Sequence, residues 1–430
     1  MSDYFPRELL VEIVSRLPVK SLLRFRCVSK SWRSLISSSS FITTHLSHFT
    51  TTHHHLLIKH FSLSSNQENY SLYPDTSAPT FHHQPLSLKC PFKTKSNTFF
   101  RLVSTTHGLL CLSDDHFGYT STLILWNPSL RKYVTLPQPR ICYDSYGPYM
   151  FALGCGFDTN TNDYKVVRIA YVQHRPDSWE PNSGISPQEG YLVPPQVEVF
   201  SLRNNSWKPI TSNIPQHRMV EYFWSSVFVN GAIHWLGYCL KKQEGQSYSN
   251  VIIGFDVGGE IFKDLSLPKM LVDEYPLNLS ISVCGEMITV FQYDSWPKSQ
   301  RCCVWVMKEY GVVESWSKQF TVELSNIYAV LGFRRNGEVL IAKSDGEVVL
   351  YNPKSNGVGK IEIRGGRDSF FVGNFAESLV LLDGGKHVNC YDEEEEEAVF
   401  RGEDRAMVGL LERTSSMHYA FAVHFLNNPY

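Results

Sequence analysis

The histidines and aspartates of this chain are the residues whose chemistry must be weighed first. Six histidines cluster in one short segment, at His45, His48, His53, His54, His55 and His60. A metal site would need two of them four positions apart on a helix, or an HExxH context, and neither pattern occurs. We therefore predict a polar connecting segment here and no metal site. Asp158, Asp163 and Asp256 could in principle converge as in a glycosidase, but isolated aspartates more often bond their own turn backbone.

Cysteine spacing gives no further chemistry. The ten cysteines stand at positions 27, 90, 111, 142, 155, 239, 284, 302, 303 and 390, and no two form a CxxC pair. Unpaired spacing favours free thiols that pack as small apolar groups. The chain also lacks GxSxG, P-loop and dinucleotide-binding patterns. The sequence thus predicts no catalytic residue, no redox or metal centre and no cofactor.

Charge and hydropathy restrict the possible partners. The formal net charge is only −2 over 430 residues, which provides no electrostatic surface for nucleic acid or an anionic membrane. No apolar run reaches the length of a bilayer span, and the residues after Met1 lack the apolar core of a signal peptide. We expect a protein of the cytoplasm, the nucleus or both, without a nucleic-acid or membrane partner.

The first fifty residues have a helical pattern. From Phe5 to Leu17 one apolar stripe is flanked by charged residues, and Pro18 ends the segment. A second helix is predicted to start near Val19, and Ser29 is a candidate N-cap for a third. So small a helical unit barely offsets its own chain entropy, so we expect a partner or the rest of the chain to complete its stability. The pattern alone fits a plain helical cap or a docking surface equally well.

The residue order in this segment resembles the F-box in its plant form. The matching phrases are Phe5-Pro6, Glu12-Ile13, Arg16-Leu17-Pro18, Val19-Lys20-Ser21-Leu22, Phe25-Arg26-Cys27-Val28 and Ser29-Lys30-Ser31-Trp32. The resemblance implies binding to a Skp1-like linker protein and, through it, to the cullin and RING subunits of an SCF-type ubiquitin ligase. The linker-contacting residues that it implies are Pro6, Leu9, Ile13, Leu17, Pro18, Leu22, Leu23, Val28 and Trp32. Phe5 departs from the usual leucine but keeps a large apolar side chain.

Two phrases recur through the remainder of the chain. The first is a short strand after a tight turn, at 107–114, 230–237, 284–291, 336–343 and, weakly, 376–383. The second is a strand–turn–strand hairpin, at 123–137, 197–210, 252–268, 304–320 and 348–363, with an extra copy at 154–169. Asn-Gly pairs favour such turns. Gly231 and Gly285 are 54 residues apart, and Gly285 and Gly337 are 52 apart.

A repeat of this length built from short strands indicates a β-propeller, here of six or seven blades, rather than a sandwich of unrelated meanders. Strands from both ends should close the ring, and 54–63 and 418–426 are the candidates. This region is similar to the F-box-associated, kelch-like domain of plant F-box proteins. We therefore predict an α+β multidomain chain, with a three-helix F-box over 1–50 and an all-β propeller over 51–430. Residues 37–55 are the expected hinge, with a helix around 41–48.

The resemblance implies a non-catalytic substrate receptor of an SCF ubiquitin ligase, which promotes ubiquitination and degradation of an unidentified target protein. An F-box protein that acts outside a ligase as a binding scaffold, and a propeller enzyme, remain alternatives. Loops at 143–149, 175–195 and 293–301 are candidates for target contact because they carry aromatic residues that anchor interfaces. These residues are Tyr143, Tyr146, Trp179 and Trp296. The acidic run at 393–397 is expected to be a solvated hairpin tip.

Overall fold

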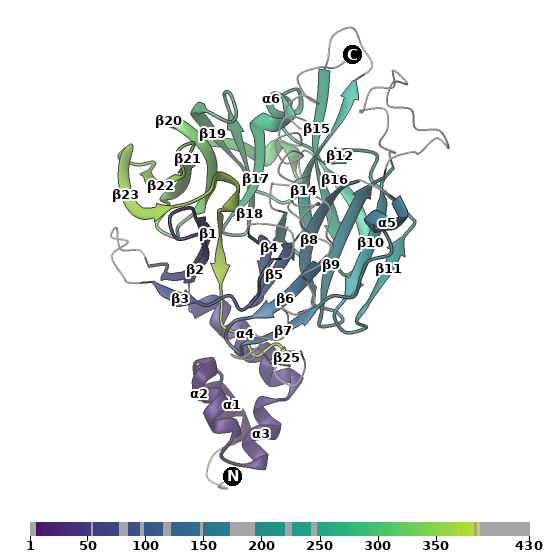
Figure 1. The fold of residues 1–430 in the computed structure, drawn as a ribbon, viewed down its shortest axis with the longest axis vertical. Helices are drawn as coiled ribbons and strands as arrows, with labels where there is room; N and C mark the ends of the chain where they lie inside the picture. The colour runs from purple at the N-terminus through teal and green to yellow at the C-terminus, as the bar shows by residue number, and fades with distance from the viewer. Residues whose placement is uncertain are drawn as a thin grey trace, which may run out of the picture.

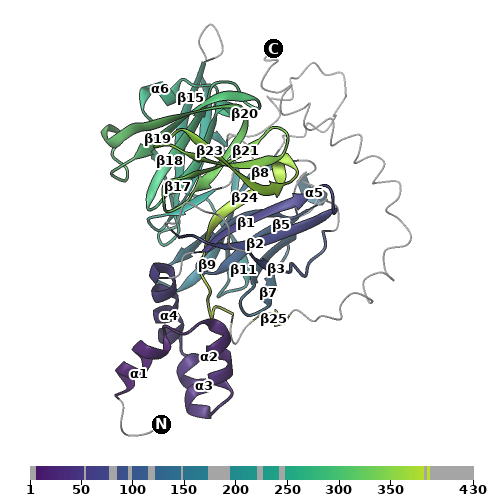
Figure 2. The same ribbon diagram turned by 90° about the vertical axis from the view of Figure 1, so that its left-hand side faces the viewer.

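A computed structural model of the chain describes residues 6–52, 55–76, 85–94, 99–114, 122–146, 149–172, 194–219, 226–241, 247–381 and 385–387. Four helices project from one end of a strand-rich domain, as Figures 1 and 2 show from two directions. They are α1 (Arg7–Val14), α2 (Val19–Arg26), α3 (Lys30–Ile36) and α4 (Ser39–Thr52). Within the described ranges, no helix combines the length and the apolar character that a bilayer span requires.

The helix boundaries follow the local signals. Pro18 is the N-cap residue of α2, and the Ser29 side chain accepts a hydrogen bond from the amide of Trp32 at the start of α3, as predicted. The helix expected around 41–48 is confirmed and is longer. The hinge expected over 37–55 is wrong, because Phe41, Leu46 and Phe49 bury the inner side of α4. The connection between head and strands is a packed helix.

The remaining elements form five antiparallel sheets. The first contains β24 (Phe371–Phe375), β1 (His55–Ser62), β2 (Gln67–Pro74) and β3 (Leu86–Leu88). The second contains β4 (Arg101–Thr106), β5 (Leu109–Asp114), β6 (Thr122–Asn127), β7 (Lys132–Thr135) and β25 (Lys386–His387). The third contains β8 (Met150–Asp158), β9 (Asp163–Tyr171), β10 (Gln196–Ser201) and β11 (Ser206–Ile210).

The fourth sheet contains β12 (Arg218–Met219), β13 (Val227–Val229), β14 (Ala232–Lys241), β15 (Ser247–Asp256) and β16 (Ile261–Leu265). The fifth contains β17 (Leu279–Cys284), β18 (Met287–Tyr293), β19 (Ser299–Met307), β20 (Trp316–Phe333), β21 (Val339–Lys343), β22 (Glu347–Asn352) and β23 (Gly357–Arg364). Short helical turns are α5 (Tyr143–Tyr146), α6 (Lys269–Val272), η1 (Pro276–Asn278), η2 (Val313–Ser315) and η3 (Arg367–Ser369).

The six hairpins predicted from the recurring phrases are confirmed by the strand pairing. The tight turns are confirmed too: Asn230 and Gly231 have φ of 51° and 72° between β13 and β14. The weak strand at 376–383 is wrong over its described part, since residues 376–381 have no strand structure. The strand predicted at 418–426 and the acidic run at 393–397 lie outside the described residues.

Among the described residues, ring closure joins β1 to β24, while the predicted closing strand at 418–426 lies outside them. β1 lies between β2 and β24, with Leu57 opposite Gly373 in the antiparallel register. The N-terminal strand therefore does share a sheet with a strand from the far end of the domain, but that strand is β24. Leu56 and Ile58 of β1 also pack against Leu340 and Val348 of the fifth sheet. These contacts join the last sheet to the first, as a propeller requires.

The fifth sheet contains two hairpin units because β20 is long enough to serve both. Its first part pairs with β19 and its last part, from Ile327 to Phe333, pairs with β21. Counting β20 twice divides the described strands into six four-stranded units, with β12 and β25 as additions. The blade number of six or seven stays a prediction. Buried side chains fill the spaces between successive sheets, such as Leu125 of β6 against Val166 of β9.

Candidate docking face and its attachment to the propeller

The predicted apolar stripe of the first helix is divided between two environments. Leu10, Val11 and Val14 face inward and pack in the core of the head. Leu9 and Ile13, one turn apart on α1, are 52% and 57% exposed. Two large apolar side chains this exposed and one turn apart make this side of α1 a candidate interaction surface.

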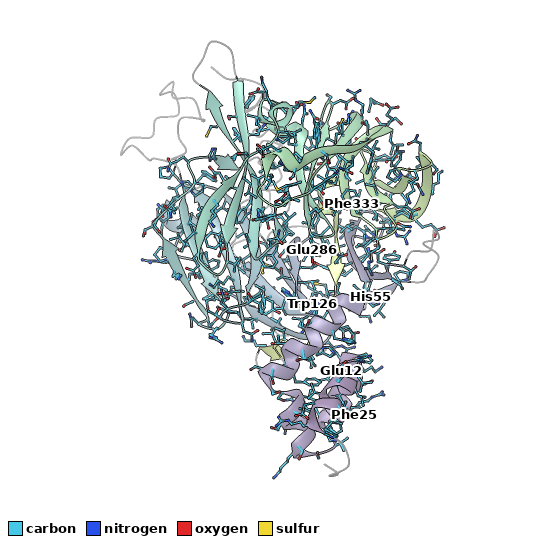
Figure 3. The ribbon with its side chains drawn as sticks, turned by 180° about the vertical axis from the view of Figure 1, so that it is seen from behind. Glu12, Phe25, His55, Trp126, Glu286 and Phe333 are labelled. Atoms are coloured by element: carbon cyan, nitrogen blue, oxygen red, sulfur yellow. The ribbon has the colours of Figure 1, made fainter. Side chains whose placement is uncertain are left out.

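Exposed apolar residues are concentrated in this head. Among the described residues, eleven large apolar side chains are exposed across the chain, and four lie between residues 9 and 28. They are Leu9, Ile13, Phe25 and Val28. Phe25, labelled in the view of Figure 3, also contacts Trp32 at a ring-centroid distance of 5.4 Å. We define these four residues as the docking face.

The nine predicted linker-contacting residues fall into three groups. Pro6, Leu9, Ile13, Pro18 and Val28 are exposed. Leu17, Leu23 and Trp32 are half-buried against the core of the head. Leu22 has no exposed surface and packs in that core, so in this conformation it is a core residue and not part of the docking face. Phe25 was missing from the prediction, although it stands inside the motif.

Charge on the outer side of α1 is balanced locally. Glu12 and Arg16, one turn apart, form an exposed ion pair. The hydrogen bond from Arg16 lowers the pKa of the Glu12 carboxyl. An ion pair this exposed contributes little stability. The outer side of α1 therefore combines charged side chains with two exposed apolar ones, Leu9 and Ile13.

The core of the head includes two residues of the propeller. Leu130, from the turn between β6 and β7, and Leu379, from the segment after β24, pack with Val19, Leu22 and Ile36. Leu379 is fully buried. Burial of apolar surface from both domains in one cluster makes the head and the propeller mutually stabilising. The head therefore packs on the rest of the chain, which is one of the two arrangements expected to complete its stability.

Asn127 holds the segment that carries Leu379. Its Nδ2 donates to the carbonyl oxygens of Ser378 at 3.0 Å and Val380 at 2.8 Å, and to the Ser378 hydroxyl at 3.1 Å. Its Oδ1 accepts from the amides of Ser129 and Leu130. The side chain is fully buried and uses both of its polar ends. Asn127 stands in the predicted hairpin at 123–137, within the segment Trp126-Asn127-Pro128, and nothing else in the sequence pointed to its role.

Helix α4 is fixed to the same core by a buried histidine. The Nε2 of His45 lies 3.1 Å from the carbonyl oxygen of Leu17, and its ring stacks on Phe49 at a centroid distance of 4.4 Å. His45 has no exposed surface. This histidine of the predicted polar segment is therefore a core residue. Within the described ranges, no group of three His, Cys, Asp or Glu side chains could hold a metal ion.

The aspartates considered for catalysis are turn residues. Asp158 accepts hydrogen bonds from the amides of Asn160 and Thr161 and contacts the Lys165 ammonium at 2.9 Å. Burial raises the pKa of Asp158, but hydrogen bonds from the Thr161 hydroxyl, the Lys165 ammonium and the Asn160 amide outweigh it and the pKa is lowered. Asp256 likewise accepts from the Gly259 amide of its own turn, whereas Asp163 accepts from the Arg203 amide in the turn between β10 and β11. These hydrogen bonds from backbone amides to the aspartate carboxylates stabilise the tight turns between the strands.

Of the nine cysteines among the described residues, all are free thiols, and Cys111, Cys155 and Cys302 are buried. Cys27 is exposed and the other five are half-buried, so the expected burial is confirmed only in part. Burial raises the pKa of the Cys90 thiol to about 12, which keeps it protonated. Cys390 lies outside the described residues.

The loops predicted for target contact are partly described. Tyr146 is half-buried against the core between the second and third sheets, and Tyr149 is buried with its hydroxyl donating to the carbonyl of Ile141. Trp296 lines a central cavity and contacts the ring of Tyr328 at 5.7 Å. Trp179 lies outside the described residues, as does most of the loop at 175–195. The described aromatic residues of these loops therefore pack within the propeller, and a role in target contact stays a prediction.

A helical head on a closed ring of antiparallel sheets defines a propeller-based adaptor architecture, and the family comparisons agree. A family model described as the F-box domain matches residues 3–44, and one described as the F-box associated beta propeller domain matches residues 47–388. The chain belongs to the F-box proteins with an F-box-associated β-propeller. An F-box generally implies a Skp1-type binding partner.

Relatives in Arabidopsis thaliana share this organisation. The chain is 29% identical over 398 residues to F-box protein CPR1, covering 87% of this chain and 88% of that protein. It is 27% identical over 359 residues to F-box/kelch-repeat protein At3g23880, covering 81% and 87%. Among solved structures, the Dos1 propeller has a TM-score of 0.33 at 10% identity and covers 72% of this chain and 67% of that one. That structural similarity is too low to support an argument.

Proposed function

We propose that this protein is a substrate receptor of an SCF-type ubiquitin ligase. Its F-box binds a Skp1-like linker protein, and through it cullin and RING subunits, while its propeller binds a target protein and promotes ubiquitination of that target. The chain itself catalyses no bond change in this scheme. We also propose that it acts in the cytoplasm, the nucleus or both.

The exposure of Leu9 and Ile13 carries the proposal. Both side chains lie on the outside of α1, more than half exposed, although the same helix buries Val14 and partly buries Leu10. A domain that served only as a helical cap would gain by placing polar residues at these positions, because exposed apolar surface adds no stability. Leu9 and Ile13 are therefore available to a partner that covers them.

The attachment of the head suggests how the receptor would accelerate ubiquitin transfer. A receptor raises the effective concentration of the target beside the loaded conjugating enzyme and restricts its orientation. Both effects depend on a fixed geometry between the linker-binding and target-binding parts. The shared core of Leu130 and Leu379 with Leu22, and the clamp made by Asn127, support such a geometry.

Binding of purified Skp1-type linker to the full chain tests the first step. In Leu9→Ala with Ile13→Ala, loss of buried apolar surface at the interface is expected to cost about 2 to 3 kcal/mol, on the order of 50-fold in Kd. Leu63→Ala is the matched control, because Leu63 is a 72% exposed leucine on the propeller. Equal affinities of the double variant and the control for the linker would refute the docking face.

The second step is tested by target stability in cells. Proteins that accumulate with the receptor under proteasome inhibition, but not with the Leu9 and Ile13 double variant, are candidate targets. For a ligase receptor, their lifetime should lengthen when the double variant replaces the parent. Unchanged lifetimes with linker binding intact would favour a scaffold outside a ligase instead.

A further inference from the structure

Charge is distributed unevenly along this chain. Residues 6–52 contain seven lysines and arginines but only two glutamates, and no acidic residue occurs from position 13 to position 67. After His387 the balance is reversed, with nine acidic and three basic residues up to Tyr430. Six of these acidic residues are consecutive, at 392–397. The small net charge of the chain is therefore the sum of a basic head and an acidic segment after β25.

Four cations of the head have no acidic partner. They lie in exposed pairs one turn apart, the first pair on α2 and the second on α3, and we call them the basic face: Lys20, Arg24, Lys30 and Arg33. Among the described residues, none of the four forms an ion pair or a side-chain hydrogen bond. Like charges one turn apart on a helix repel each other. An anionic group placed over these helices would relieve that repulsion.

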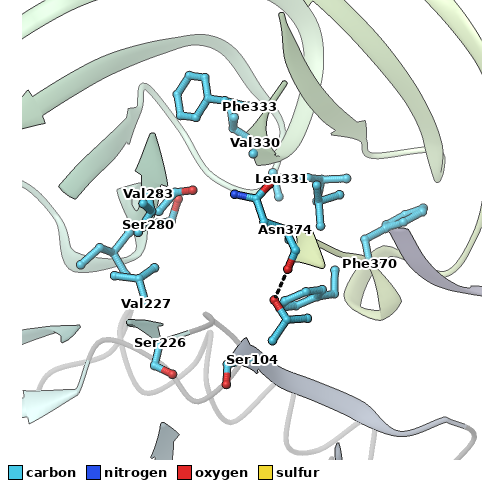
Figure 4. A pocket seen from close by; sticks show the side chains of 18 of the residues that line it. Ser104, Ser226, Val227, Ser280, Val283, Val330, Leu331, Phe333, Phe370 and Asn374 are labelled. Carbon is cyan, nitrogen blue, oxygen red and sulfur yellow. Dashed lines mark hydrogen bonds between the residues drawn. The ribbon is translucent and has the colours of Figure 1, made fainter. Parts of the chain in front are cut away.

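The cavity at the centre of the propeller has a different character. Its lining consists of hydroxyl and apolar side chains such as Ser280 and Val330 (Figure 4). Among the described lining residues only Arg367 and Asp368 carry a charge, and they are adjacent and of opposite sign. An acidic ligand would therefore find no uncompensated cation in the cavity, in contrast to the basic face.

The last described strand lies beside the head. β25 pairs with β7, with His387 opposite Lys132, and Figures 1 and 2 place β25 at the end of the propeller from which the helices project. Leu130, two residues before Lys132, packs in the apolar cluster that contains Val19, the first residue of α2. Asp392 follows His387 by five residues, so at most about 18 Å of chain separates the two. The acidic run at 392–397 thus starts within reach of α2.

We propose that the acidic run at 392–397 docks on the basic face of the same chain. Its six carboxylates act together, and the four-residue connection to β25 holds them at an effective concentration on the order of millimolar. An acidic partner or a second copy of the chain reaches the same cations only from free solution. Because the basic face is exposed to solvent, the contact weakens as salt is added.

Docking of the acidic run brings it next to the docking face. Arg24 directly precedes Phe25 in α2, and Lys30 follows Val28 by two positions, so the basic face and the docking face adjoin. The acidic run therefore competes with a linker protein for this part of the head. This consequence rests on the proposed function, whereas the docking within the chain does not.

Carbodiimide coupling of the full chain tests the docking without any partner. The reagent joins a carboxylate to a lysine ammonium where the two groups touch, with loss of water, and mass spectrometry of the monomer band identifies the joined residues. At about 50 mM salt, coupling of 392–397 to Lys20 or Lys30 should exceed coupling to Lys354 at least about ten-fold. Lys354 is an exposed lysine between β22 and β23. In about 1 M salt, which screens charges beyond about 3 Å, the excess should disappear. Lys386, close to the run in sequence, is the positive control for the reagent.

Two pairs of substitutions show whether the basic face holds the run. Arg24→Gln with Arg33→Gln removes half of the basic face but neither of its lysines, so coupling to these lysines should fall about five-fold. Arg203→Gln with Arg301→Gln is the matched control on the propeller, because both arginines are exposed there. The control pair should leave coupling unchanged.

Titration with a purified Skp1-type linker tests the competition. Changing the five glutamates at 393–397 to glutamine should raise the linker affinity of the full chain about three- to five-fold at about 50 mM salt. The control removes the same charge by changing five exposed propeller glutamates to glutamine, and it should bind the linker as the parent does. The side chains of these five make no hydrogen bond or ion pair among the described residues: Glu286, Glu309, Glu314, Glu323 and Glu362.

Four results would count against these statements, each in a different way. Coupling to Lys20 and Lys30 at the level of Lys354 would overturn the docking. Coupling found only in a dimer band would overturn it in favour of a second copy. Equal effects of the two arginine pairs would exclude the basic face as the site. Equal linker affinities of the 393–397 variant and its control would overturn the competition, and a linker that binds none of these proteins would refute the proposed function instead.

Discussion

The Glu377 carboxylate accepts a hydrogen bond of 3.0 Å from the backbone amide of Val19, which lies 358 positions earlier in the chain. Val19 is the first residue of α2, where backbone amides have no partner within the helix. Glu377 thus provides the cap that Pro18, the N-cap residue of α2, does not provide. An anion at this end of a helix is also favoured by the helix dipole. The propeller in this way completes a helix of the F-box.

Glu377→Ala should therefore weaken α2 selectively. We expect a loss of about 1 kcal/mol, the usual value of a helix cap, because the Val19 amide is left without its acceptor. Hydrogen exchange of the α2 amides should become faster, while exchange in β5 and β15 stays unchanged. Uniform acceleration across the propeller would contradict this capping role.

Asn127→Ala should loosen the head from the propeller. The variant removes a fully buried side chain with three donor and two acceptor contacts, so we expect about 3 kcal/mol less stability. Small-angle scattering should also show a wider range of head positions.

Asn352→Ala is the matched control for Asn127→Ala. Asn352 stands in the related Tyr-Asn-Pro phrase, and its Oδ1 accepts the equivalent turn bonds from Lys354 and Ser355. Among the described residues its Nδ2 has no distant partner, so its loss should cost less and leave the head fixed. Equal effects of the two variants would show that Asn127 acts only on its turn.

Leu22→Ala and Ile13→Ala should separate folding from docking. Leu22 is fully buried, so its truncation should cost about 3 kcal/mol of head stability. Ile13 is 57% exposed, so its truncation should change stability by less than about 0.5 kcal/mol while weakening linker binding. Denaturant unfolding followed by hydrogen exchange in α2 and α3, with linker titration alongside, measures both. If Leu22→Ala kept the head folded and still lost the linker, Leu22 would be a contact residue after all.

Acid should destabilise the propeller through His234. Burial lowers the pKa of His234 to about 4, from 6.5, and its Nε2 lies 2.8 Å from the Tyr310 hydroxyl. Because the unfolded chain binds this proton more tightly, stability falls as the pH drops from 6.5 towards 4. Between pH 7 and pH 5 we expect a loss of about 2 kcal/mol from this group. Urea unfolding of His234→Gln should show a pH dependence smaller by that amount; an unchanged dependence would exclude His234 as the source.

Lys59 should change the stability of the propeller at alkaline pH, whereas His234 acts at acidic pH. Its side chain is 1% exposed, donates to the Phe100 carbonyl at 2.6 Å, and has a pKa that burial lowers to about 8. Since the unfolded chain keeps this proton to higher pH, stability should rise by about 2 kcal/mol between pH 7.5 and pH 9.5.

Comparison of Lys59→Met with the parent isolates the Lys59 contribution. Buried thiols such as Cys302, whose pKa burial raises, oppose the effect of Lys59 in both proteins and cancel in the difference. Parallel stability curves for the two proteins from pH 7.5 to pH 9.5 would contradict the assignment.

Local pattern was sufficient for most elements of the fold. Apolar periodicity and Pro18 determined the first helices, and the hairpins with their Asn-Gly turns followed from alternation and positive φ. The docking face was predicted only in part. Resemblance to the F-box marked Leu9, Ile13 and Val28, but the helical wheel placed Leu9 and Leu10 on the same stripe. Only packing decided that Leu10 faces inward and Leu9 outward.

The sequence by itself thus determined the two-part organisation, the class of the chain and the strand-rich repeat, because these depend on contacts between near neighbours. The tertiary structure alone decided that β24 closes the ring, that Leu379 enters the core of the head, and that Glu377 caps α2. Residues 376–381 were predicted to be a strand because a short apolar segment has the same composition in a strand and in an irregular segment buried in a core. Their position is set instead by Asn127 and by the apolar core of another domain, and such long-range contacts leave no period in the local sequence.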